Sequence, residues 1–370
     1  MAQAPGIRAQ ALSGFFTRRY GFHAEKHIVG ATIFKRDTGR GSIERMVVKH
    51  APLGQGNVAP RDDGEIEVEE RVLRSLWGSE HNVRLISITD DRDHKGARWD
   101  RPINRTETPW TLPWKLPVND RRYPRVSGFR FFAMEYLARG TGEALLKRCV
   151  ALGIAKISQP VLWYFFLCLT RACVGIAYPP SRKNRNPPEV WRETLPVPGQ
   201  RRSRISHGDL HLGNVMFGDY DVGNANAQPG CHHVTPILKI IDFGMASKED
   251  SSKEAHEHNM LNVGEKLMHE LSQAGRFATV FEDYDSMPVY EIDDIDGRDP
   301  FDTWATEEFY ESDDFTQDFK VIVAACMAAR PEDRPTLQEV LDTCERNIAL
   351  TPNWIDFKDE VSDLFDMPGN

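Results

Sequence analysis

Two short polar segments combine residue types at a spacing suited to handling a phosphate group. In the first, Asp209 precedes Asn214 by five residues, and His207 stands two residues before the aspartate. In the second, Asp242 directly follows an apolar run that we interpret as a buried strand. One carboxylate can accept the proton of an attacking hydroxyl, while another carboxylate and an amide oxygen can hold Mg²⁺ against phosphates. The two segments together therefore favour phosphoryl transfer from a nucleotide.

The composition is that of a globular protein. Of its 370 residues, 40% are hydrophobic and 27% are charged, which is enough for one large domain or two lobes. The net charge of −9 gives no general attraction to nucleic acid, so we expect no nucleic-acid partner. The longest apolar stretch, about 161–174, is interrupted by Arg171 and is too short to span a bilayer. We expect no signal peptide, a short disordered leader and a cytoplasmic location, with a nuclear one also open.

The six cysteines show no Cys-x-x-Cys pairing. Cys168 and Cys173 lie in an apolar, helix-like run, so we expect buried thiols in a reducing compartment. The sequence Cys231-His232-His233 contains metal-ligating residue types. No second cluster stands at ligand spacing, and we therefore predict no metal centre there.

The elements that must position the polar segments divide into a β-rich part and a helical part. Strands are predicted within 22–50, where 27–34 forms one strand and 37–42 a hairpin turn. A helix is predicted over 65–77, and a further strand over 129–137. The later apolar periodicities predict helices over 142–152, 157–177, 259–274, 315–329 and 337–350. This pattern predicts an α+β fold.

Several polar stretches fit none of these elements. A long insert is expected at about 90–127, with further inserts at about 179–204 and 218–235. The acidic stretch 282–318 could attract a basic partner, but we interpret it as a solvated, mobile insert.

In these features the chain resembles the eukaryotic protein kinase-like superfamily, over about residues 20–350. Asp209 and Asn214 match its catalytic loop, and Asp242 matches its magnesium-binding aspartate. The resemblance implies a bilobal fold, with a small β-rich N-lobe over 1–137, a larger helical C-lobe over 138–350 and a C-terminal tail over 351–370. It also implies ATP and Mg²⁺ as cofactors, with Asn214 and Asp242 as the metal ligands and Asp209 as the catalytic base.

The resemblance assigns further residues to the nucleotide. Lys49 looks like the lysine that contacts the phosphates, and Glu69 looks like the glutamate that pairs with it, so both would join Asp209 as catalytic residues. Glu67 and Glu70 compete with Glu69 for that pairing. The residues Met134, Glu135 and Leu137 resemble the gatekeeper and hinge that meet the adenine ring.

The chain departs from the family in four places. Only Gly30 remains of the glycine-rich loop that covers the phosphates, and Gly208 replaces an arginine common before the catalytic aspartate. The segment after Gly244 is short and holds no Ala-Pro-Glu. Lastly, the form His-Gly-Asp-Leu-His is similar to the loop of aminoglycoside phosphotransferase-like and choline kinase-like enzymes. Within that loop we expect His207 to brace the backbone, and His211 to stand where protein kinases commonly have lysine.

The late segment Arg330-Pro-Glu-Asp-Arg-Pro-Thr336 is similar to that of protein kinases, which favours a protein acceptor. We therefore expect a divergent protein serine/threonine kinase that moves the ATP γ-phosphate to a hydroxyl. Two alternatives stay open: a small-molecule phosphotransferase, favoured by the catalytic-loop sequence, and a pseudokinase scaffold, favoured by the lost glycine loop. The sequence leaves the oligomeric state open.

Overall fold

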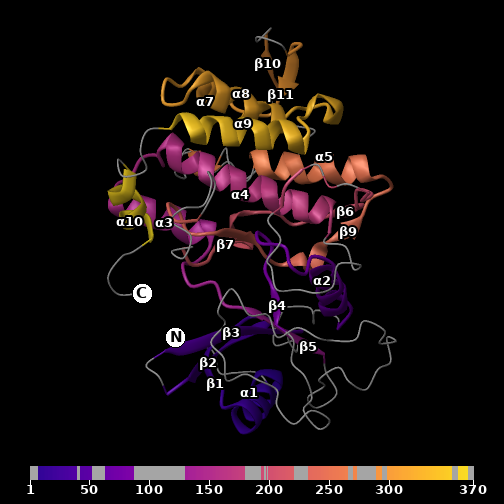
Figure 1. The fold of residues 1–370 in the computed structure, drawn as a ribbon, viewed down its shortest axis with the longest axis vertical. Helices are drawn as coiled ribbons and strands as arrows, with labels where there is room; N and C mark the ends of the chain where they lie inside the picture. Colours follow the sequence, from indigo (N-terminus) through magenta and orange to yellow (C-terminus); the bar gives the residue numbers. More distant parts are fainter. Residues whose placement is uncertain are drawn as a thin grey trace.

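The computed structural model describes residues 7–39, 42–51, 63–86, 130–179, 193–195, 197, 199–220, 232–265, 270–272, 289–293, 298–351 and 357–365. Within them the fold is α+β: a five-stranded antiparallel sheet with helices at the N-terminal end, then a mostly helical region (Figure 1). The insert expected at 90–127 lies outside the described residues, as do most of the inserts 179–204 and 218–235 and half of the tail 351–370.

The N-terminal sheet has the strand order β1-β2-β3-β5-β4, and every neighbouring pair is antiparallel. Its strands are β1 (His23–Ile28), β2 (Ala31–Asp37), β3 (Ile43–His50), β4 (Leu85–Ile86) and β5 (Phe131–Glu135). The prediction of one strand over 27–34 was wrong, because Ile28 pairs with Ala31 across a tight turn. Gly30 makes this turn possible, since its φ of 75° lies in the left-handed region that glycine adopts without a side-chain clash.

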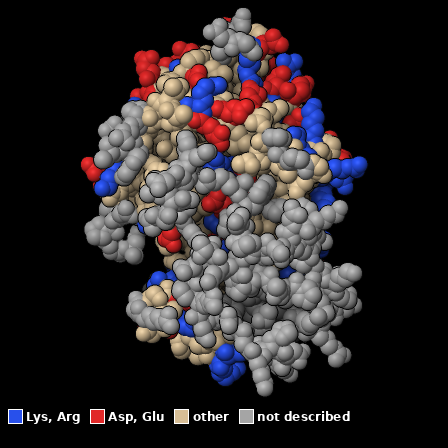
Figure 2. Space-filling view, in the orientation of Figure 1, with Lys and Arg blue, Asp and Glu red and all other residues tan. Residues whose placement is uncertain are grey.

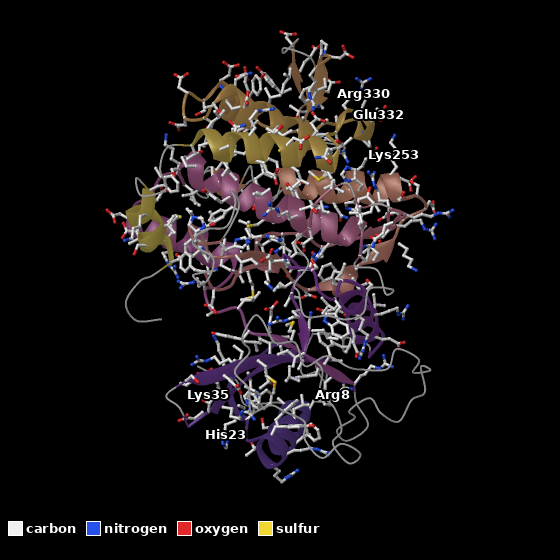
Figure 3. All side chains as sticks on the ribbon, in the orientation of Figure 1. Arg8, His23, Lys35, Lys253, Arg330 and Glu332 are labelled. Atoms are coloured by element: carbon white, nitrogen blue, oxygen red, sulfur yellow. The ribbon has the colours of Figure 1, made fainter. Side chains whose placement is uncertain are left out.

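Helix α1 (Ile7–Tyr20) covers one face of this sheet. Leu12 and Phe16, four residues apart, are both buried in a hydrophobic cluster with sheet residues such as Phe34. Arg8, labelled in Figure 3, donates from Nη1 to the carbonyl oxygen of Ala51 at 2.9 Å. The disordered leader predicted for this segment was therefore wrong, because the apolar stripe of the helix has a sheet to pack against.

Helix α2 (Asp63–Ser75) confirms the helix predicted over 65–77, and it contacts β3, β5 and the short 3₁₀ helix η2 (Phe243–Met245). The chain that follows α2 is joined to the helical region through the backbone of one residue. Ile240 donates its N–H to the His81 carbonyl at 3.0 Å, and its carbonyl accepts from the Val83 N–H at 2.9 Å. The end of α2 is thus fixed to the strand that precedes Asp242.

The helical region is built around α4 (Gln159–Ala177), which lies beside α9 (Leu337–Leu350) (Figure 1). Helix α4 has 19 residues and lies within the helix predicted over 157–177. It is long and apolar enough to cross a membrane, but 89% of its apolar window is buried inside the protein. Cys168 and Cys173 on this helix are buried free thiols, as predicted. The other helices are α3 (Gly142–Leu152), α5 (Ser252–Asn262), α6 (Glu270–Ser272), α7 (Glu307–Glu311), α8 (Gln317–Cys326) and α10 (Lys358–Phe365).

Three two-stranded antiparallel sheets complete the helical region. They pair β6 (Ile205–Ser206) with β9 (Ser247–Lys248), β7 (Val215–Phe217) with β8 (Leu238–Ile240), and β10 (Tyr290–Ile292) with β11 (Phe301–Thr303). The last pair and α7 fall in the acidic stretch 282–318, where Phe301 and Phe309 are buried. The described part of this stretch is therefore packed structure, not a solvated insert. Figure 2 shows acidic and basic side chains interspersed over this end of the visible face.

Candidate functional site

The centre of the candidate site is a buried lysine between two carboxylates. The Nζ atom of Lys49, on β3, lies 2.6 Å from Oε2 of Glu69 on α2 and 2.5 Å from Oδ1 of Asp242. Lys49 is 7% exposed and Glu69 is 1% exposed, so the ammonium and this carboxylate are held away from bulk water. Three segments that are remote in sequence thus meet at one charged group.

The two rival glutamates of α2 are engaged elsewhere. Glu67 lies 3.6 Å from Arg71 and 3.1 Å from Arg130. Glu70 lies 2.5 Å from Arg74, one helical turn away. Of the three glutamates, the structure therefore pairs Glu69 with Lys49.

Asp242 has an unusual backbone. Its φ of 59° is the only positive value among the non-glycine residues that the structure describes. Such a conformation costs about 1–3 kcal/mol and persists where the surroundings enforce it, often at functional sites. Here Oδ1 of Asp242 accepts a hydrogen bond from the Gly244 N–H at 3.3 Å, and the same atom meets the Lys49 ammonium.

Asp209 and Asn214 are joined to each other within the loop that precedes β7. Nδ2 of Asn214 donates to the Asp209 carbonyl oxygen at 2.7 Å and to its Oδ2 at 3.1 Å. The Asn214 carbonyl in turn accepts from the Ile241 N–H at 2.9 Å, which ties this loop to the residue before Asp242. Because the amide nitrogen is used within the loop, Oδ1 of Asn214 is the atom suited to a metal.

His207 forms a second link between the two polar segments. Its Nε2 donates to the Ile241 carbonyl at 2.9 Å, while Nδ1 accepts the Asp209 N–H at 3.3 Å. Burial lowers the pKa of His207 to about 4, so the ring is neutral near pH 7, in keeping with one donor and one acceptor nitrogen. These bonds fit the predicted bracing role.

Gly208 is required by its surroundings. Its φ of 77° is left-handed, and a Cβ atom at this position would clash with the Met245 carbonyl oxygen. The next histidine, His211, is 44% exposed at its side chain, and its Nδ1 accepts the Gly213 N–H at 3.1 Å. Its Nε2 lies 3.8 Å from Oδ2 of Asp209, so this ring borders the predicted base.

Of the residues predicted to contact the nucleotide, Met134 and Glu135 lie on β5, Leu137 follows this strand, and Gly30 lies in the turn beside Lys49. Met134 and Leu137 are buried, and the Glu135 side chain accepts from Lys239 Nζ and from the Arg84 N–H, each at 2.7 Å. Burial favours the neutral Glu135, but Lys239 and Arg84 outweigh it and lower its pKa. Gly30 adjoins Ala31, which pairs with Lys49 across β2 and β3.

The site residues therefore form two groups joined through Ile241: Lys49, Glu69 and Asp242 in one, and Asp209 with Asn214 in the other. Asp242 and Asn214 offer a carboxylate and an amide oxygen, which are the hard oxygen ligands that suit Mg²⁺. The donor set thus fits the metal that the sequence predicted.

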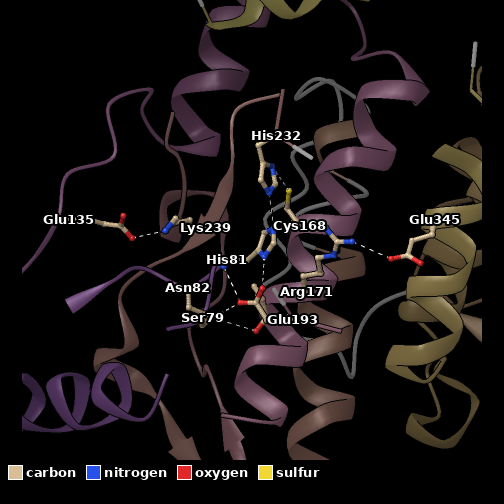
Figure 4. Close-up of polar contacts among 11 residues, drawn as sticks. Ser79, His81, Asn82, Glu135, Cys168, Arg171, Glu193, His232, Lys239 and Glu345 are labelled. Carbon is tan, nitrogen blue, oxygen red and sulfur yellow. Dashed lines mark hydrogen bonds and ion pairs between the residues drawn. The ribbon is translucent and has the colours of Figure 1, made fainter. Parts of the chain in front are cut away.

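Sequence reasoning missed a buried polar network around His81 (Figure 4). Nδ1 of His81 lies 2.7 Å from Oε2 of Glu193, and its Nε2 lies 3.1 Å from Nε2 of His232. The Nδ1 atom of His232 lies 3.8 Å from the Cys168 sulfur. The burial of His81 opposes its charge, but the Glu193 carboxylate outweighs burial and raises the pKa of His81 to about 9. The only signal in the sequence was His232 within Cys-His-His.

No protein-family model matches this chain, and no curated protein matches it significantly.

Proposed function

We infer that this chain is an ATP- and Mg²⁺-dependent phosphotransferase with a bilobal, protein kinase-like fold. The observation that carries the proposal is the contact of the Lys49 ammonium with both Glu69 and Asp242, at 2.6 and 2.5 Å. A lysine held over phosphates by one carboxylate, next to a second carboxylate able to bind metal, is the arrangement that phosphoryl transfer uses. The backbone links from Ile241 to Asn214 and His207 support the presence of Asp209 in the same site.

Each polar group has a role that its geometry supports. Lys49, oriented by Glu69, would bind the nucleotide phosphates, and Asp242 with Oδ1 of Asn214 would hold Mg²⁺. When bound, Mg²⁺ neutralises part of the charge that develops on the transferring phosphoryl group. Asp209, whose Oδ2 accepts from Asn214 at 3.1 Å, would orient the acceptor hydroxyl and take its proton.

The adenine ring would lie against Met134 and Leu137. Because the Glu135 carboxylate is bound to Lys239 and the Glu135 N–H donates to the Arg84 carbonyl at 3.0 Å, recognition at this position would use the Glu135 carbonyl. Gly30 would bring the backbone of the β1–β2 turn toward the phosphates, without the further glycines of a glycine-rich loop.

The acceptor we propose is a serine or threonine hydroxyl of a protein, as the Arg330–Thr336 segment favours. One observation favours a small alcohol as the second candidate. Gly208 has no room for a larger side chain, and His211 stands 3.8 Å from Asp209 at the place where protein kinases commonly have lysine, so the loop keeps the form seen in enzymes that act on small alcohols.

The test is γ-phosphate transfer by the purified full-length chain with Mg²⁺ and ATP, offered basic proteins in one set and amino-alcohols and sugars in the other. Asp209→Asn removes the base at nearly constant shape and should lower turnover about 10²–10⁴-fold. Asp219→Asn, at an exposed position after β7, is the matched control and should retain wild-type turnover. The set that is phosphorylated identifies the acceptor class.

Nucleotide binding is measured separately by thermal unfolding. A ligand at 100 times its dissociation constant stabilises a protein by about 2.7 kcal/mol, and Asp209→Asn should keep this gain. Wild-type turnover in Asp209→Asn would refute the assignment of the base. A wild-type chain that gains no stability from Mg²⁺ and ATP would indicate a scaffold instead of an enzyme.

A further inference from the structure

A second cluster of metal-ligating side chains lies in the core of the protein, apart from the polar groups assigned to phosphoryl transfer. It consists of His81, Cys168 and His232, whose ligand atoms all lie within 4.8 Å of one another (Figure 4). His81 follows α2, Cys168 lies on α4, and His232 lies shortly before β8. Each of the three residues is at most 3% exposed.

We propose that His81, Cys168 and His232 form a binding site for Zn²⁺. Imidazole nitrogen and thiolate sulfur are the ligands that zinc prefers, whereas Mg²⁺ prefers oxygen. Two zinc-bound nitrogens in a tetrahedron, at bond lengths of about 2.0–2.1 Å, stand roughly 3.3 Å apart. The two Nε2 atoms of His81 and His232 are 3.1 Å apart, so small side-chain shifts would admit the ion.

The surroundings of His81 match those of a histidine that binds metal. Such a histidine usually donates its other ring N–H to a carboxylate, which fixes the ring and makes the free nitrogen a better ligand. Here Nδ1 of His81 faces Oε2 of Glu193 at 2.7 Å, while Nε2 faces the cluster. Glu193 is in turn held by the Ser79 hydroxyl and by the His81 N–H, the latter at 3.0 Å.

The charges of the proposed site balance. Zinc carries two positive charges, and the Cys168 thiolate and the Glu193 carboxylate carry one negative charge each, so the buried assembly is neutral in sum. Binding displaces the proton of the Cys168 thiol and any proton on Nε2 of His81, both of which pass to solvent. His232 binds as the neutral ring. Three protein ligands leave the fourth tetrahedral position to a water molecule.

Zinc at this position would connect the end of α2 to α4 and to the chain entering β8. The ion would not share ligands with the predicted Mg²⁺ site, because Asn214 and Asp242 are outside the cluster. The proposal therefore stands or fails independently of the phosphotransferase assignment.

The test uses the full-length chain, kept reduced, freed of metal with a chelator and assayed in millimolar Mg²⁺. After zinc is added back and excess is removed by gel filtration, elemental analysis should find about one zinc per chain, bound by the His81, Cys168 and His232 cluster. Cobalt in place of zinc should give the thiolate-to-cobalt charge-transfer absorption that only a sulfur ligand produces.

The variants separate this site from adventitious binding. Cys168→Ala should abolish the charge-transfer band, whereas Cys173→Ala, a buried thiol on the same helix outside the cluster, should keep it. Glu193→Gln should keep the band but weaken zinc binding about 10–100-fold, as loss of a supporting carboxylate does.

Zinc that is lost on gel filtration, or a band of equal strength in Cys168→Ala, would overturn the proposal. Should Cys168→Ala not fold, the wild-type cobalt spectrum decides alone, and a spectrum without the band refutes the site. In that case the four side chains form only a hydrogen-bonded network.

Discussion

Replacing Glu69 by glutamine tests the charged centre of the site without changing the shape of the side chain. The wild-type carboxylate meets Lys49 Nζ with both oxygens, at 2.6 Å for Oε2 and 2.8 Å for Oε1. Glu69→Gln keeps one acceptor oxygen and the packing but removes the negative charge. The buried ammonium then depends on Asp242 at 2.5 Å.

The expected loss of stability follows from the burial of both partners. Removing one partner of a buried ion pair costs about 3–5 kcal/mol, because a charge is left uncompensated in the interior. The cost for Glu69→Gln should lie at the low end, about 3 kcal/mol, since Asp242 still balances Lys49. Replacing both members of the pair, by Lys49→Met with Glu69→Leu, should cost less than the sum of the two single changes, because neither member of the pair is left buried without the other.

Urea unfolding measures these differences, with the slope of the transition checked so that a shift in midpoint reports stability alone. Glu67→Gln is the matched control on the same helix. Its side chain is 32% exposed, and its partner Arg71 is 70% exposed, so the change should cost less than about 1 kcal/mol.

The reasoning fails if Glu69→Gln and Glu67→Gln destabilise the protein equally. It also fails if the double replacement is as costly as the sum of its two single changes, because the buried pair would then contribute no coupling energy.

Two other perturbations test parts of the fold. Gly208→Ala should lower the free energy of unfolding by about 1–3 kcal/mol through backbone strain, and further through the clash with the Met245 carbonyl. Gly153→Ala, at a φ of 69° but with open space around it, should lower it by about 1 kcal/mol. Thermal unfolding measures both, and equal losses would contradict the clash. Burial lowers the pKa of His256 from 6.5 to about 4. Protons therefore bind the unfolded chain first, and stability should fall by roughly 2 kcal/mol from about pH 7 to about pH 5. His256→Gln should remove that part of the pH dependence, which urea unfolding measures. A variant with the same pH dependence as the wild type would refute the role of His256.

The sequence was sufficient to predict those elements whose structure is decided by local residue patterns. The apolar spacing predicted α3 and α9 at the bounds that the structure has. The α+β arrangement followed from strands preceding helices. The Lys49–Glu69 contact was expected through the family resemblance, in which register alone favoured Glu69 over Glu67 and Glu70.

Other features depend on contacts between distant segments. Helix α1 was missed because its short apolar stripe gains stability only when the sheet covers Leu12 and Phe16. The His81 cluster was missed because its members stand 87 and 64 residues apart along the chain, a spacing no local motif describes. The requirement for glycine at 208 was hidden for the same reason, since the Met245 carbonyl approaches from another loop.

The two hydrogen bonds that Ile240 makes with the chain after α2 have a mechanical consequence. They hold the segment between the helix that bears Glu69 and β4 against β8, the strand that leads to Asp242. Because β4 belongs to the same sheet as β3, which bears Lys49, backbone hydrogen bonds connect the sheet to the strand that leads to Asp242. A change in the spacing of Lys49 and Asp242 would therefore require these backbone hydrogen bonds to stretch or break.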